Sequence, residues 1–71
     1  MIVNKFEQDG LLGKIFKTEI GYYFRIYYNK KEVAQMYYYS HTYQDAENNM
    51  FETMKTIDVS KLEIKNDNRS H

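Results

Sequence analysis

Apolar and polar positions alternate in the middle of the chain in a pattern that predicts a β-hairpin. Residues 22–28 read YYFRIYY, and this enrichment in aromatic and β-branched residues favours a strand over a helix. The polar residues NKK interrupt the pattern, and a second apolar run follows over residues 33–39. We therefore expect two antiparallel strands joined by a three-residue loop at residues 29–31.

The register of this hairpin follows from its loop length. A three-residue loop pairs the apolar side chains on one face: Ile26 with Ala34, Phe24 with Met36, and Tyr22 with Tyr38. The other face then carries Tyr23, Arg25, Tyr27, Val33, Gln35 and Tyr37. Because side chains alternate between faces, a shift of one residue would send Met36 and Ala34 to the polar face. We predict the first register because it buries the larger apolar surface.

Two further strands are expected before the hairpin. The dipeptide Asp9-Gly10 is a tight-turn signal between the short apolar run near Ile2 and the segment LLGKIFKTEI. In that segment Ile15 and Phe16 are both apolar and must point to opposite faces. The pattern does not decide which of the two faces the core.

After the hairpin the spacing of apolar residues changes to that of a helix. Thr42 followed by Asp45 forms a start signal similar to a capping box. An apolar stripe then recurs at helical spacing through Ala46, Met50, Met54 and Ile57. These features predict a helix over residues 43–56 that covers the Phe24 face of the sheet. The following DVSKLEI is compatible with an edge strand or with a further turn.

The expected fold is a small α+β domain: an antiparallel sheet of three or four strands with one amphipathic helix on one face. We expect one compact domain over residues 1–64 and a mobile polar tail over residues 65–71, which contain no apolar side chain to anchor them. A chain of 71 residues without cysteine has only a thin core and no disulfide to support it.

Charge and hydropathy narrow the classes of partner and compartment. Ten basic and ten acidic side chains cancel, which argues against a general nucleic-acid binder and against an anchor on an anionic membrane. There is no apolar run of the length of a signal peptide or of a membrane span, so we expect a cytoplasmic protein. The excess of Lys over Arg is typical of low-GC bacteria and their phages.

No residue pattern predicts catalysis, a metal site or a cofactor. The two histidines, His41 and His71, form no pair at metal-binding spacing, and cysteine is absent. Ser40 and His41 are adjacent in sequence, but no nucleophile-elbow glycine pattern accompanies them, and Ser40 suits the turn before the helix. Three isolated glycines cannot form a phosphate-binding loop. We therefore expect a protein that is not an enzyme.

The tyrosines give the strongest indication of function. Seven of them fall between residues 22 and 39, and about half of these are expected simply to pack the core. One helix covers only one sheet face, which leaves four predicted partner-binding residues on the other: Tyr23, Arg25, Tyr27 and Tyr37. Tyr and Arg are enriched at binding hot spots because they bring a large contact area and a polar group.

Three kinds of partner are compatible with such a face. A protein partner is favoured, bound either by this face or by addition of a strand at an uncovered edge of the sheet. Single-stranded nucleic acid is the main alternative, because aromatic side chains on a sheet stack on bases. GYYFRIYY resembles a strand of the RNA-recognition motif, although Ile20 stands where that family has a basic residue and the chain is too short for its βαββαβ order. The third is a homodimer through the same face.

A short sheet followed by one capped helix resembles many tiny phage-encoded inhibitors, including anti-CRISPR proteins. The segment YYYSHTYQDAENNMFETMKTI is also similar to the strand-to-helix half of small bacterial ββα domains. The first resemblance implies stoichiometric blockade of a host protein, and it carries over no residue identities. The sequence thus predicts a small inhibitor or adaptor that occludes a partner protein's surface.

Overall fold

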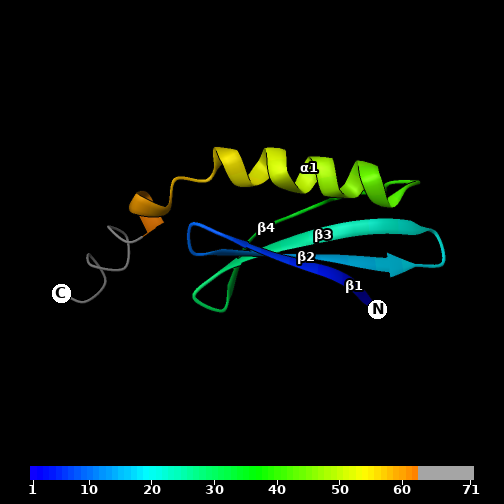
Figure 1. The fold of residues 1–71 in the computed structure, drawn as a ribbon, viewed down its shortest axis with the longest axis horizontal. Helices are drawn as coiled ribbons and strands as arrows, with labels where there is room; N and C mark the ends of the chain where they lie inside the picture. The colour runs from blue at the N-terminus through cyan, green and yellow to red at the C-terminus, as the bar shows by residue number, and fades with distance from the viewer. Residues whose placement is uncertain (63–71) are drawn as a thin grey trace.

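The computed structural model describes residues 1–62 and shows a four-stranded antiparallel sheet followed by a helix (Figure 1). In chain order, which is also the order in the sheet, the elements are β1 (Ile2–Gln8), β2 (Leu11–Thr18), β3 (Gly21–Tyr28), β4 (Lys31–Gln35) and then α1 (Tyr43–Thr56). The predicted small α+β fold is confirmed. The predicted domain boundary at residue 64 and the tail over residues 65–71 lie outside the described residues.

Two tight turns with left-handed backbone connect the outer pairs of strands. The φ angles of Asp9 and Gly10 are 53° and 84°, and those of Asn29 and Lys30 are 50° and 68°. Two successive positive φ angles are typical of the type I′ turn, whose twist matches that of the flanking strands. The first turn is the one that Asp9-Gly10 predicts, and both turns keep consecutive strands adjacent in the sheet.

The core lies between α1 and one face of the sheet, and Figure 1 shows the helix running along that side. Its seven buried side chains come from β2, β3 and α1: Leu11, Ile15, Phe24, Ile26, Ala46, Met50 and Met54. Ile15 is paired with Phe24, and Phe16 with Tyr23. This register resolves the ambiguity of the sequence, since Ile15 faces the core and Phe16 faces away from it.

Gly13 allows α1 to approach β2 closely. A Cβ atom built on this glycine would lie 2.5 Å from the Sδ atom of Met50, which is closer than such atoms are found in proteins. Met50 is fully buried and occupies the space that a side chain at position 13 would need. The glycine in the middle of a strand is therefore explained by helix packing.

Local capping sets the start of α1. The Thr42 hydroxyl accepts a hydrogen bond of 3.1 Å from the backbone amide of Asp45, as the sequence predicts. The helix ends with Ile57 as its C-cap, and the predicted bounds are confirmed. A further helical turn begins at Val59, which is one of the two structures expected for DVSKLEI.

The predicted hairpin register is confirmed near its centre but is wrong at both ends. Ile26 pairs with Ala34, and the Met36 amide donates to the Phe24 carbonyl at 3.0 Å. The loop has two residues rather than three, and an irregularity at Val33 supplies the missing residue and turns Val33 toward the core.

At the far end of the hairpin, Tyr22 pairs with Ser40 and not with Tyr38. The Ser40 amide donates to the Tyr22 carbonyl at 2.7 Å, and the Tyr22 amide donates back at 2.8 Å. The intervening residues bend away from the sheet, so β4 ends at Gln35. The predicted strand over residues 33–39 is correct only in its first part.

Candidate interaction surfaces

One face of the sheet is left uncovered within residues 1–62, because α1 packs against β2 and β3 from the other side. We call it the open face. Its central, half-buried side chains come from β2 and β3: Leu12, Lys14, Phe16, Tyr23, Arg25 and Tyr27. Three of the four predicted binding residues, Tyr23, Arg25 and Tyr27, therefore lie together on this face.

An aromatic cluster occupies one half of the open face. The rings of Phe16 and Tyr23 are stacked, with centroids 4.8 Å apart and planes 9° apart, because these residues are directly paired across β2 and β3. Tyr39, in the segment after β4, packs against Tyr23 at 5.4 Å. Offset-stacked and tilted aromatic pairs stabilise such a cluster and hold its rings in place.

Arg25 lies beside this cluster. Its guanidinium carbon is 5.7 Å from the Phe16 ring centroid and 5.5 Å from that of Tyr23, within the range of cation–π attraction. The Nε atom is 3.7 Å from the Glu32 carboxylate, and it is buried without a hydrogen-bond acceptor among the described residues. The neighbouring Tyr27 hydroxyl, followed by Tyr23 and Glu32, raises the pKa of Arg25, so its charge is retained.

The other half of the open face is hollowed next to the turns. A depression of about 360 Å³ is lined by residues of β1, β2 and β3 and of both type I′ turns: Glu7, Gly10, Leu12, Lys14, Tyr27, Asn29 and Lys30. The Lys14 ammonium lies 4.9 Å from the centroid of the Tyr27 ring. The open face thus combines an aromatic cluster with an adjacent hollow lined by charges of both signs.

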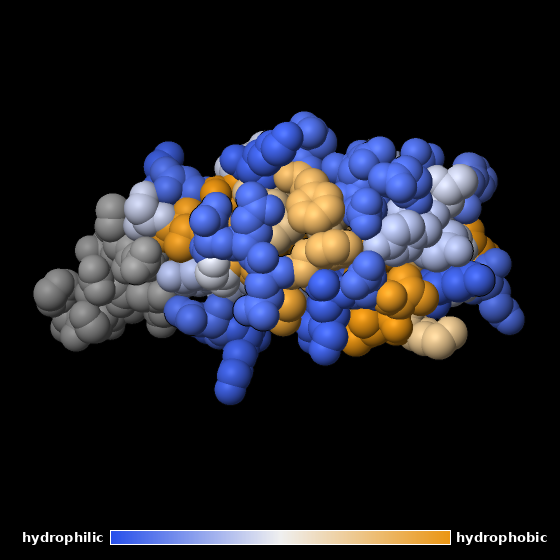
Figure 2. Space-filling view, viewed as in Figure 1, coloured by the Kyte–Doolittle hydropathy of each residue, from blue (hydrophilic) through white to orange (hydrophobic). Residues whose placement is uncertain are grey.

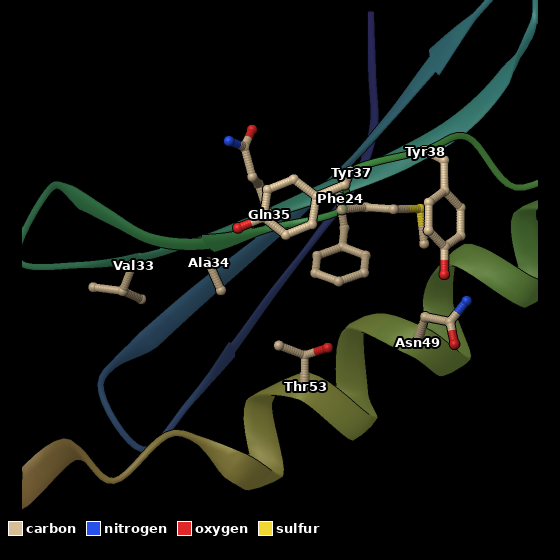
Figure 3. Close-up of a pocket in the computed structure, with 9 residues that line it drawn as sticks. Phe24, Val33, Ala34, Gln35, Tyr37, Tyr38, Asn49 and Thr53 are labelled. Carbon is tan, nitrogen blue, oxygen red and sulfur yellow. The ribbon is translucent and has the colours of Figure 1, made fainter.

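Tyr37, the fourth predicted binding residue, does not lie on the open face. It follows the end of β4, is 89% exposed, and lines a groove of about 430 Å³ between that edge of the sheet and α1 (Figure 3). In Figure 3 the Phe24 ring lies between the strands and the helix, and Tyr38 extends toward Asn49 of α1. The prediction placed Tyr37 wrongly because it extended β4 past Gln35.

The sequence pattern missed three apolar contributors to the open face: Leu12, Phe16 and Tyr39. Alternation along β2 would have found the first two once Ile15 had been assigned to the core. Tyr39 could not be found in this way, since its position depends on the pairing of Tyr22 with Ser40.

The described residues contain no group of three or more His, Cys, Asp or Glu that could hold a metal ion. His41 is exposed in the segment before α1. Over residues 1–62, no helix is both long and apolar enough to cross a membrane. No protein-family model, curated protein or solved structure matches this chain.

Proposed function

We propose that the protein is a small, non-enzymatic binding module that places the open face of its sheet against a partner protein. The observation that carries this proposal is the cluster of Phe16, Tyr23 and Arg25 on a sheet face that α1 leaves uncovered. Aromatic and Arg side chains that are held in place lose little conformational entropy on binding, and they are the types enriched at hot spots. Occlusion of the partner's surface, by an inhibitor or an adaptor, is the expected mode of action.

The chemistry of the face indicates what the partner must offer. A hydrophobic or aromatic side chain would cover the ring cluster, and an acceptor such as a carboxylate would satisfy the Arg25 guanidinium. The surrounding charges are mixed in sign, with Lys14 and Arg25 near Glu7 and Glu32. Such a rim favours a partner whose surface is also mixed in charge.

Single-stranded nucleic acid is the second candidate, and ring geometry disfavours it. Base stacking needs ring faces that are free, whereas Phe16 and Tyr23 stack on each other and the Arg25 guanidinium lies close to both. A phosphate backbone would also need more positive charge than this balanced face supplies. A protein partner therefore fits the face better. The resemblance to phage-encoded inhibitors would make that partner a host defence or regulatory factor in the cytoplasm.

The test replaces both Tyr23 and Tyr27 with Ser after the partner has been recovered from an extract of the native host, with and without nuclease. Neither side chain supports α1, so the circular-dichroism spectrum is expected to be retained. Affinity measured by calorimetry is expected to fall by at least about 2 kcal/mol if these are hot-spot residues. The matched control is Tyr37→Ser, which removes a tyrosine from the groove and is expected to leave affinity unchanged.

The dependence of affinity on salt then identifies the class of partner. An interface of buried tyrosine changes little between low and moderate salt, whereas phosphate contacts release counterions and lose affinity steeply. A nuclease-sensitive ligand with a steep salt slope that Arg25→Ala makes shallower would establish the nucleic-acid alternative. Equal losses in Tyr37→Ser and in the double variant would move the site away from the open face.

A further inference from the structure

The two edges of the sheet differ in what they offer to another strand. β4 is short, and the irregularity at Val33 divides it into two-residue pieces. β1 pairs regularly with β2 from Asn4 to Gln8, and among the described residues no strand pairs with its outer edge. Bulges and short length protect an edge from further pairing, so β1 is the edge that can accept a strand.

The backbone groups that β1 directs outward can be identified. The two-residue Asp9–Gly10 turn makes Gln8 and Leu11 a hydrogen-bonded pair, and such pairs recur at every second residue of an antiparallel ladder. Asn4, Phe6 and Gln8 therefore direct their amides and carbonyls toward β2. Lys5 and Glu7 direct theirs outward, and both residues are exposed.

We propose that two copies of the chain associate through antiparallel pairing of β1 with β1, in the register that places Lys5 opposite Glu7 of the second copy. The two-fold axis then passes beside Phe6. By symmetry each interface contains the Lys5–Glu7 pair twice, on the open-face side of the sheet. The two four-stranded sheets join into one, and the two open faces become a continuous surface.

Charge selects this register over its neighbours. Only registers that pair outward-directed residues with each other can form hydrogen bonds. A shift of two residues in one direction places Lys5 opposite Lys5, and a shift in the other direction places Glu7 opposite Glu7. Like charges directly opposite each other are unfavourable and opposite charges are favourable. The proposed register also uses all of Asn4 to Gln8 and ends where the irregularity near Val3 begins.

On the helix side of the same edge, Phe6 is the apolar residue between Asn4 and Gln8. Phe6 packs edge-to-face on Phe51 with ring centroids 5.0 Å apart, and both rings are half-buried. Across the two-fold axis the two Phe6 residues form a non-hydrogen-bonded pair, whose Cα atoms approach to about 4.5 Å. Figure 2 shows apolar side chains in the middle of this side of the molecule, between sheet and helix, and again near the N-terminus. A second copy would cover the Phe6–Phe51 pair.

The experiment is a charge exchange read by sedimentation equilibrium over a concentration series. The wild-type chain is expected to form dimers. Lys5→Glu and Glu7→Lys alone each convert both attractive pairs to repulsive ones, and each is expected to weaken dimerisation by at least about tenfold. The double variant Lys5→Glu/Glu7→Lys is expected to restore it, and an equimolar mixture of the two single variants is expected to form heterodimers.

Amide exchange followed by NMR tests the register directly. In the dimer the Glu7 amide is expected to become protected with rising concentration, while the Phe6 amide is protected in monomer and dimer alike. The Lys5 amide, which donates to the Asn4 side-chain oxygen at 2.9 Å in the single chain, is expected to exchange that bond for one to the second copy. A wild-type chain that stays monomeric, single variants that dimerise normally, or a mixture that fails to form heterodimers would each overturn the proposal. It does not depend on the proposed function, because Tyr23→Ser/Tyr27→Ser is expected to leave the dimer intact.

Discussion

Lys30 holds a backbone conformation that is unfavourable for most residues. Its φ of 68° lies in the left-handed region, which costs a residue with a Cβ atom roughly 1–2 kcal/mol. The type I′ turn between β3 and β4 requires positive φ at both central positions. Asn29 tolerates this conformation well, whereas an exposed Lys gains nothing there. Strain in this turn is therefore concentrated at a single residue.

Replacing Lys30 with Gly is expected to stabilise the protein. Relief of the left-handed strain outweighs the extra freedom that Gly gives the unfolded chain, which leaves a net gain of about 0.5–1 kcal/mol. Urea denaturation followed by circular dichroism measures the free energy of unfolding. The matched control is Lys31→Gly, which weakens β4 at the residue paired with Tyr28 and is expected to destabilise. A loss of stability in Lys30→Gly would show that this turn is unstrained.

The two type I′ turns also show what single residues can predict. Asp9-Gly10 is a recognisable turn because Gly adopts positive φ freely. In NKK all three residues are polar, and the sequence does not indicate which two form the turn. Which two residues form the turn depends on the irregularity at Val33, because this extra residue allows Ile26 to pair with Ala34 after a two-residue turn. That pairing is a property of β3 and β4 together.

The helix could be predicted to its terminal residues because its signals are local. Thr42 caps it, and Met50 and Met54 recur one turn apart on its buried face. The end of β4 could not be predicted, since it depends on the distant pairing of Tyr22 with Ser40. The same contrast applies to the open face. Alternation along β3 correctly predicted that Tyr23, Arg25 and Tyr27 share a face. Tyr37 was misplaced because it lies beyond the end of β4, where alternation no longer holds.

Packing of α1 on β2 leads to a prediction at Gly13. In Gly13→Ala the new methyl group meets the sulfur and the adjacent carbon of the fully buried Met50 side chain, which must shift within the core to admit it. Overpacking of this kind costs about 1–3 kcal/mol, even though Ala suits a strand better than Gly. We expect a lower midpoint in urea denaturation, together with a shift of the Met50 methyl signal in NMR spectra.

The control for this substitution is Lys14→Ala, the next residue in β2. Its side chain lies on the open face, away from α1, and the change is expected to alter the free energy of unfolding by no more than about 0.5 kcal/mol. Equal destabilisation by the two variants would mean that β2 is sensitive along its whole length. The close approach of the helix would then not be the reason for glycine at position 13.

The side chain of Tyr43 joins the first strand of the sheet to the helix. Its hydroxyl, at the start of α1, accepts a hydrogen bond of 2.8 Å from Asn4 of β1 and donates one of 2.7 Å to Glu47. The ring also packs edge-to-face on Tyr22 of β3, with centroids 6.1 Å apart. One residue thus connects the first strand, the third strand and the helix.

This connection predicts how stability depends on alkaline pH. Burial, followed by the hydrogen bond to Glu47, raises the pKa of Tyr43 above its ordinary value of about 10. A group whose pKa is raised by folding stabilises the folded state fully below its unfolded pKa, and this stabilisation is lost as the pH rises through the folded pKa. The contribution of Tyr43 is therefore complete at neutral pH and declines above about pH 10.

Comparison of wild type with Tyr43→Phe isolates this contribution. At neutral pH the variant loses the hydroxyl's hydrogen bonds and is expected to be less stable by about 0.5–1.5 kcal/mol. Above about pH 10 the two proteins are expected to converge in urea denaturation, because ionisation removes the proton that Tyr43 donates to Glu47 and places a charge in a partly buried site. Tyr37→Phe, at an exposed tyrosine without these contacts, is the control and is expected to follow the wild type at every pH. A difference between wild type and Tyr43→Phe that stays constant across the alkaline range would show that the proton donated by Tyr43 to Glu47 contributes nothing to stability.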